Sequence, residues 1–288
     1  MSDPLPERAD RRDQVDRAGE GVLFVATGPD YIEEAAASAN ASRPRLGGRP
    51  IAIVADDPGL AERTGAFDRA IPHTEARRDF RDKIPPLCDP PFERTLFLDS
   101  DARVIAPTPE LVDDLFRLLE HHDLAAAHAP VRRPPSWWDD AVPAHWPEFN
   151  TGVLLFTRRG AETAMRHWRR RFDEAFERHG ETWDQATFRS AAWQAAGEGV
   201  PIAVLPPEAN LRTTKPWVAG KGLAVSILHG RVPDAERDAL IAFLNDDIDR
   251  FRTNAEWLER HPHSSIRPRV RRPRRRGFEG WLRRIFGG

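Results

Sequence analysis

The stretch Thr95-Leu-Phe-Leu-Asp-Ser-Asp101 decides the fold class of this chain, because an apolar run ends there directly in two carboxylates. Residues 95–98 suit a buried strand. Asp99 and Asp101 follow it at once, and in open α/β sheets ligands bind outside the carboxyl ends of the strands. Two carboxylates two residues apart can hold one hard divalent cation, with substrate phosphates completing the shell. The alternative is an ordinary turn, in which Asp is also favoured.

Strands and helices alternate on both sides of this stretch. Upstream, residues 21–26 and 50–55 are short apolar runs that end in turn signals, and a helix is expected over residues 30–42 between them. The alternation predicts an α/β fold, a single Rossmann-like domain in which helices flank a mixed, mostly parallel central sheet. Further elements are expected as strands at 124–129, 149–156, 200–205 and 224–228, and as helices at 109–119, 161–176, from Thr182 and at 234–257.

The length of the chain, 288 residues, is enough to bury one large core. We expect a disordered segment at 1–20, a folded domain at 21–260 and a basic amphipathic tail at 261–288. No apolar run approaches the ~18 residues of a membrane-spanning helix, and the first twenty residues lack the apolar region of a secretory signal. Cys88 is the only cysteine, which excludes disulfides and cysteine-based zinc sites. These features predict a cytoplasmic protein.

The net charge of −2 hides a split between the body and the tail. Residues 267–288 hold nine arginines and one acid, so they carry +8 and the rest carries −10. An acidic body argues against nucleic-acid binding. The apolar residues of the tail have helical spacing: Phe278, Trp281, Leu282, Ile285 and Phe286. This pattern predicts a helix on an anionic membrane surface and hence a peripheral association; the alternatives are a disordered tail or a helix docked on the acidic body.

Seven short motifs follow one another in a characteristic order over residues 21–231. They are Val25-Ala-Thr-Gly28 with Tyr31, Lys83, Thr95-Leu-Phe-Leu-Asp-Ser-Asp101, Phe149-Asn-Thr-Gly-Val153, Asp184-Gln185, Asn210-Leu-Arg212 and Ile227-Leu-His-Gly230. In this order the chain resembles the GT-A nucleotide-diphospho-sugar transferases, in particular the glycogenin-like and lipopolysaccharide-galactosyltransferase-like enzymes. The resemblance implies one GT-A domain, a UDP-sugar donor, Mn²⁺ (or Mg²⁺) and mostly retention of anomeric configuration. It leaves open the donor sugar and the acceptor, which could be a saccharide, a lipid-linked molecule or a protein.

The resemblance also assigns nucleotide-binding roles, one position at a time. It implies that Thr27 and Tyr31 line the base, that Asp56 contacts base or ribose, and that Lys83 reaches the ribose or the sugar phosphate. Each position has a plainer interpretation: a strand-to-helix turn with a packed Tyr31, a turn aspartate, and a solvated surface lysine.

For the metal and the diphosphate, the resemblance implies that Asp99 and Asp101 share the ion with His229, while Asp99 and Ser100 also face the nucleotide. Imidazole suits manganese better than magnesium. The family often continues from this histidine into a Lys-Pro-Trp run that grips the diphosphate. Here Arg231 stands in that place, and we expect it to substitute.

For the transferred sugar, the resemblance places Asp184 and Gln185 beside the anomeric carbon, Asn150 on the sugar or acceptor, and Arg212 on the acceptor or the donor phosphate. The sequence also permits a capping box, in which Thr182 caps a helix and Gln185 returns a bond to the cap backbone. In that interpretation Asp184 is a first-turn acid that the helix dipole favours.

These motifs predict a metal-dependent glycosyltransferase with a nucleotide-sugar donor. An inverting course would need a base, for which Asp184 is the nearest candidate. One alternative is a non-catalytic protein that binds nucleotide-sugars or carbohydrates on the same fold. Another is a haloacid-dehalogenase-like phosphatase, but there the Asp-x-Asp pattern opens the domain and is followed by Gly-Thr or Thr-like residues, whereas Ala102 follows it here.

Overall fold

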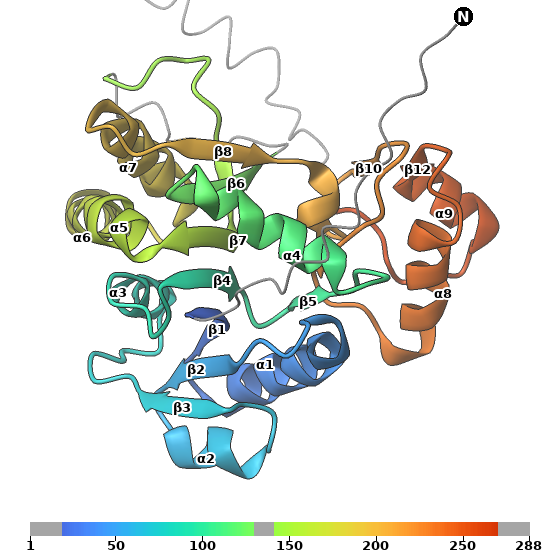
Figure 1. Cartoon of the computed structure of the whole chain (residues 1–288), viewed down its shortest axis with the longest axis horizontal. Coiled ribbons are helices and arrows are strands. Elements are labelled where there is room, and N and C mark those ends of the chain that lie inside the picture. Colours follow the sequence, from blue (N-terminus) through green and yellow to red (C-terminus); the bar gives the residue numbers. More distant parts are fainter. Residues whose placement is uncertain (1–18, 130–140, 270–288) are drawn as a thin grey trace, which may run out of the picture.

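The computed structural model describes residues 19–129 and 141–269 (Figure 1). The predicted disordered segment therefore lies outside the described residues except for its last two positions. The membrane-binding helix predicted in the tail also lies outside them, as do Trp137 and Trp138 from the stretch 130–147, which is rich in Pro and Trp and is expected to be a long loop. Within residues 19–129 and 141–269, no helix is both long and apolar enough to cross a bilayer.

A seven-stranded sheet of order β3-β2-β1-β4-β7-β6-β8 forms the centre of the molecule. The strands are β1 (Glu20–Ala26), β2 (Ile51–Ala55), β3 (Arg69–Pro72), β4 (Arg94–Leu98), β6 (Leu124–His128), β7 (Phe149–Thr157) and β8 (Ile202–Leu205). The strands β3, β2, β1 and β4 run parallel, β7 is antiparallel to both of its neighbours, and β8 is parallel to β6. The predicted α/β class with a mixed, mostly parallel sheet is thereby confirmed.

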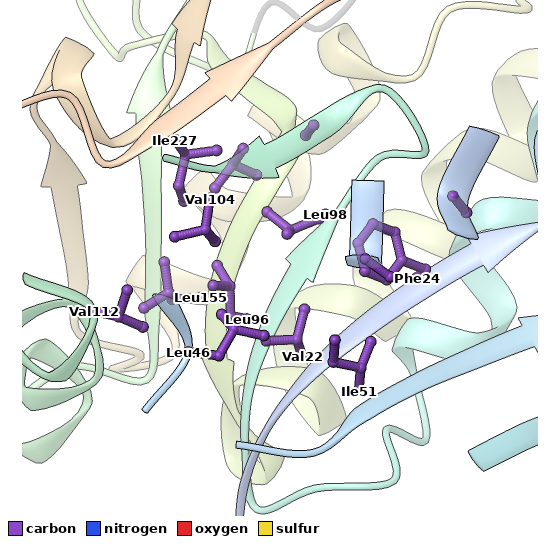
Figure 2. Packing of buried hydrophobic residues seen from close by; sticks show 14 of the residues in the cluster. Val22, Phe24, Leu46, Ile51, Leu96, Leu98, Val104, Val112, Leu155 and Ile227 are labelled. Carbon is purple, nitrogen blue, oxygen red and sulfur yellow. The ribbon is translucent and has the colours of Figure 1, made fainter. Parts of the chain in front are cut away.

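Side chains of the central strands alternate between two buried layers, as the period of a strand requires. Val22 and Phe24 of β1 lie in one cluster with Leu96 of β4 (Figure 2), while Leu23 and Phe97 lie in the cluster on the other face. The first layer is covered by α1 (Pro29–Ser42), α2 (Pro58–Arg63) and α4 (Glu110–Arg117), and the second by α3 (Ile84–Leu87), α6 (Arg166–His179) and α7 (Gln185–Gly197). Burial on both faces explains why these strands are continuous apolar runs.

The helix expected at 161–176 is entered through two short segments, α5 (Arg158–Gly160) and a π-helical turn (Ala161–Met165), before α6 begins. Met165, Trp168 and Phe172 are fully buried, as is expected for apolar residues that recur on one face of the predicted helix. Within residues 19–129 and 141–269 there are also four short 3₁₀ segments: Arg43–Arg45, Phe80–Lys83, Leu118–Glu120 and Pro207–Ala209.

A second, three-stranded sheet stands at the carboxyl end of β4 and has the order β5-β11-β9. Its strands are β5 (Ala102–Val104), β11 (Ile227–His229) and β9 (Leu211–Arg212). Beside it lie the strand pair β10 (Val218–Ala219) and β12 (Arg252–Thr253) and the helices α8 (Asp234–Asn245) and α9 (Asn254–Arg260), which are grouped at one end of the molecule in Figure 1.

The single helix predicted over 234–257 is wrong, because the chain there forms α8, β12 and α9 in turn. The break follows from the guanidinium of Arg252, which is fully buried and donates to the carbonyl oxygens of Leu244 at 2.7 Å and Leu223 at 2.9 Å. A continuous helix could not satisfy these donors in the interior, and a buried cation without partners is costly.

The amino end of β1 is held by a buried ion-pair cluster. Arg49 contacts Glu20 at 2.5 Å and Asp113 at 2.7 Å, and its side chain has no exposed surface. The guanidinium also lies over the ring of Phe116 at 4.4 Å. This cluster ties β1 to α4 across the first core layer.

Candidate active site

Three potential metal ligands meet where β4 and β11 end and β5 begins. Asp99 and Asp101 lie between β4 and β5, and His229 lies opposite Ala102 in the antiparallel pairing of β11 with β5. The Nε2 atom of His229 is 3.4 Å from Oδ1 of Asp101 and 3.8 Å from Oδ2 of Asp99. One ligand atom from each of the three residues lies within 4.8 Å of the others, so they could hold one metal ion.

The space between these ligands is kept open by Gly152 of β7. A Cβ atom on this residue would lie 2.0 Å from Cε1 of His229 and 2.6 Å from Oδ2 of Asp99. The carbonyl oxygen of Gly152 also accepts the backbone N–H of Asp99 at 2.8 Å. Two carboxylates and one imidazole around a gap that only glycine leaves fit a divalent cation.

The charge state of Asp101 suits a metal ligand. Burial would raise the pKa of its carboxyl, but the hydrogen bond and the charge of His229, together with Arg231 and Arg212, lower the pKa to about 2. The carboxylate is therefore ionised throughout the neutral range, and no proton competes with a cation.

A chain of four buried side chains fixes the orientation of His229. Nδ1–H of His229 donates to Oδ1 of Asn210 at 2.8 Å, Nδ2 of Asn210 donates to Oδ1 of Asn150 at 2.8 Å, and Nδ2 of Asn150 donates to Oε1 of Gln185 at 2.9 Å. The backbone N–H of Gly152 sets the direction of the chain, because it can only donate and its acceptor is Oδ1 of Asn150 at 3.1 Å. The Nε2 atom of His229 is thus turned toward the two aspartates, the orientation in which a metal ion could replace its contact with Asp101.

Lys83 links the metal cluster to Asp184. Its ammonium is 2.9 Å from Oδ1 of Asp99 and 3.0 Å from Oδ2 of Asp184, and it donates to the hydroxyl of Thr151 at 3.3 Å. The Thr151 hydroxyl in turn donates to Asp184 at 2.8 Å. Burial opposes the charge on Lys83, but the two carboxylates outweigh it and raise its pKa. Lys83 is therefore a partly buried cation of the site that is bound to two carboxylates, and not a solvated surface lysine.

The capping box, the alternative interpretation of residues 182–185, does not form. The helix α7 begins at Gln185, Asp184 precedes it, and no side chain caps it. The amide oxygen of Gln185 instead accepts from Asn150 at 2.9 Å and from Nη1 of Arg212 at 3.4 Å. Gln185 is buried at the cleft wall. If its side chain bonded to the helix backbone, as in a capping box, the amide of Asn150 would lose its acceptor.

At the carboxyl end of β1, Thr27 and Tyr31 line the same cleft, and the Tyr31 side chain is 52% exposed there. Asp56 is not among the lining residues. Its carboxylate accepts the backbone N–H of Gly28 at 2.9 Å and Nε of Arg78 at 2.8 Å, and Arg78 does line the cleft. Burial opposes ionisation of Asp56, but these two donors lower its pKa.

The segment 77–82 was not recognised in the sequence, and several of its residues line the cleft together with Tyr31. Asp82 holds it in place by accepting the hydroxyl of Thr27 at 2.8 Å and the backbone N–H groups of Arg77 and Arg78. Arg78 has a left-handed backbone (φ 60°), and Phe80 exposes 64% of its surface. A lone phenylalanine within a charged run was the one available signal.

Ser100 and Arg231 both contact Glu34 of α1, a residue that the sequence motifs do not single out. The hydroxyl of Ser100 donates to Oε2 of Glu34 at 2.7 Å, and Nε of Arg231 donates to Oε1 at 2.6 Å. Arg231 lies at the rim of the cleft, whereas the Arg212 guanidinium lies deeper and has no ion pair within residues 19–129 and 141–269.

One cleft of about 670 Å³ joins all these groups, a volume typical of ligand sites. It contains every predicted site residue except Asp56. Trp146 lies outside it and packs edge-on against Phe149 and Trp193.

The fold is that of the GT-A glycosyltransferases, as the sequence motifs predicted. A structure of the galactosyltransferase LgtC in complex with donor and acceptor sugar analogues is similar to this chain, with a TM-score of 0.51 and 13% identity over 77% of this chain and 95% of that one. An active-site mutant of LgtC gives a TM-score of 0.49 and 14% identity over the same shares, and mouse xyloside xylosyltransferase 1 gives 0.44 and 15% over 74% of this chain and 100% of that one. No known family model and no curated protein matches the sequence.

Proposed function

We propose that this protein is a metal-dependent glycosyltransferase that transfers a sugar from a UDP-sugar to an acceptor. The observation that carries the proposal is the meeting of Asp99, Asp101 and His229 around the gap at Gly152, in a GT-A fold and in one cleft with Tyr31 and Gln185.

Asp99, Asp101 and His229 would hold the ion, and an imidazole among the ligands favours manganese over magnesium. When bound, a divalent cation supplies a Lewis acid that neutralises the charge of a leaving diphosphate. Lys83 and Arg231 add fixed positive charge on either side of the aspartates, where phosphate oxygens would lie.

The exposed rings of Tyr31 and Phe80 would hold the base at the far end of the cleft from Gln185. Thr27 completes this end through its bond to Asp82. Aromatic rings that remain exposed inside a cleft suit a planar ligand better than solvent.

The contacts of Asp184 favour transfer with retention. Lys83 and Thr151 both hold Oδ2 of Asp184, which suits a carboxylate that is fixed in place and leaves Oδ1 as its one oxygen for the role of a dedicated base. Gln185 is neutral and cannot serve as a base. We therefore assign Asp184, Gln185 and Asn150 to positioning of the sugar, while the leaving phosphate takes the acceptor's proton.

The test is release of UDP from a panel of UDP-, GDP- and ADP-sugars in the presence of Mn²⁺. We expect activity with a UDP-sugar, its loss in Asp101→Ala, and its persistence in the control Asp114→Ala, an exposed aspartate of α4. UDP binding without turnover by any donor would favour the non-catalytic alternative, and NMR of the product anomer would decide the stereochemical course.

A further inference from the structure

The segment 264–269 forms one wall of the cleft, and its position is fixed by specific contacts. The backbone N–H and the hydroxyl of Ser265 donate to Oε1 of Glu236 on α8 at 3.0 and 2.6 Å. Ile266 is buried in a hydrophobic cluster that also contains Trp257 and Phe243. The backbone N–H of Arg269 donates to the carbonyl oxygen of Thr214 at 3.0 Å. Arg267 and Arg269 are thus held at the cleft by their backbone.

Three cations gather on this wall, namely Lys215, Arg267 and Arg269, and all three line the cleft. Arg267 donates only to carbonyl oxygens, of Ser264 at 3.0 Å and Pro262 at 2.5 Å. Within the described parts of the chain, neither Arg267 nor Arg269 has an acidic partner, and both are exposed. Like charges on one wall repel each other, and an anion bound beside Arg267 and Arg269 relieves that repulsion.

The strand order separates this wall from the nucleotide end. In the three-stranded sheet, β11 lies between β5 and β9. The two aspartates precede β5, His229 ends β11, and Lys215 follows β9 by three residues. His229 therefore lies between the aspartates and Lys215. Tyr31 and Glu34 belong to α1, on the β5 side, and Arg231 is bound there. Because the backbone of Arg269 is bonded to Thr214, the three cations lie on the other side of His229 from α1.

We propose that Lys215, Arg267 and Arg269 form a subsite for a phosphate group on the acceptor. The proposal rests on the proposed function, because a donor bound at the aspartates leaves this end of the cleft to the acceptor. Two guanidinium forks and an ammonium match the charge and the several acceptor oxygens of a phosphate. The phosphate could belong to a soluble sugar phosphate or to a lipid head group.

The experiment uses the full chain with Mn²⁺ and saturating UDP, which occupies the donor site. Calorimetric titration with glucose 6-phosphate, inorganic phosphate and glucose forms one arm, and vesicles of phosphatidylcholine with and without phosphatidylglycerol form the other. Arg267→Gln/Arg269→Gln is compared with Arg274→Gln/Arg275→Gln, a pair from the same basic run with the same change of charge.

We expect the phosphate probes, but not glucose, to bind the wild type. Binding should weaken at least about tenfold in Arg267→Gln/Arg269→Gln, because each charge-assisted hydrogen bond contributes to it, and the control pair should bind as the wild type does. A response confined to the phosphatidylglycerol vesicles would assign the phosphate to a lipid, and a response to glucose 6-phosphate would assign it to a soluble acceptor.

Equal weakening in the two double variants would overturn the subsite, since diffuse charge would then explain the binding. A matching loss of UDP affinity in Arg267→Gln/Arg269→Gln would also overturn it, because these arginines would then serve the donor, and so would the absence of binding in both arms. Failure of the wild type to bind UDP with Mn²⁺ would instead refute the proposed function.

Discussion

Replacing Gly152 with alanine should abolish metal binding while leaving the fold intact. The new Cβ would lie 2.0 Å from Cε1 of His229, which is roughly 1.5 Å inside the carbon–carbon contact distance of about 3.5 Å. The same Cβ would also lie only 2.6 Å from Oδ2 of Asp99, so both ligands clash with it. The imidazole must therefore move by more than an ångström and give up its 2.8 Å bond to Asn210.

Loss of such an orienting contact typically lowers metal affinity about 10- to 100-fold, and the displaced ligand adds to that loss. The overpacking should cost about 1–3 kcal/mol of stability, which leaves a folded protein. The assay is titration of Mn²⁺ in the presence of UDP, with the free ion followed by EPR, beside thermal unfolding of the metal-free chain.

Gly197 is the matched control, because a Cβ there would meet no atom within 4 Å. Gly197→Ala should keep the metal affinity of the wild type. If Gly152→Ala is folded and binds Mn²⁺ as tightly as the wild type, the ion does not lie between Asp99, Asp101 and His229, and the reasoning fails.

Three further predictions follow from other contacts. Asn210→Ala should lower Mn²⁺ affinity about 10- to 100-fold, because His229 loses the acceptor of its Nδ1–H; the same EPR titration measures it, and unchanged affinity would contradict the role of the hydrogen-bond chain. Arg49→Met should lower the free energy of unfolding in urea by about 3–5 kcal/mol, because the buried carboxylates of Glu20 and Asp113 lose the cation between them, and the ion pair of Glu20 with Arg94 replaces only part of that charge; a loss below about 1 kcal/mol would be too small for this account. Burial raises the pKa of the Cys88 thiol from 9.0 to about 11, so the folded chain keeps a proton that the unfolded chain releases. The unfolding free energy should then fall between pH 9 and 11 by up to about 1.4 kcal/mol per pH unit, and Cys88→Ala should lack that slope.

The inner strands of the central sheet were predictable because their burial is local information, whereas the edge strand β3, which is only partly buried, was not predicted. Residues 21–26, 50–55 and 95–98 are apolar at consecutive positions, and a strand buried on both faces requires that pattern. The helix at 234–257 was wrong for the opposite reason. The helix is broken because Arg252 donates to carbonyl oxygens elsewhere in the chain. The spacing of apolar residues along the sequence does not indicate such a contact.

Some contacts of the candidate site depend on segments that are distant in the sequence. The motif order indicated that His229 belongs with the aspartates, but the pairing of β11 with β5 decides their separation. Nothing in the sequence around Lys83 indicates its two carboxylate partners, Asp99 and Asp184. Gln185 fits a local capping pattern in the sequence, but in the structure its amide oxygen accepts from Asn150 instead of bonding to the helix backbone.

The sequence by itself therefore determined the α/β class, the strands and the aspartates at the end of β4, because apolar runs and turn residues act over a few neighbouring positions. Only the tertiary structure decided the gap at Gly152, the direction of the hydrogen-bond chain from His229, and the cationic wall of Lys215, Arg267 and Arg269. These features arise where strand pairing and core packing bring remote residues within a few ångströms, and the geometry of that packing is set by the whole fold.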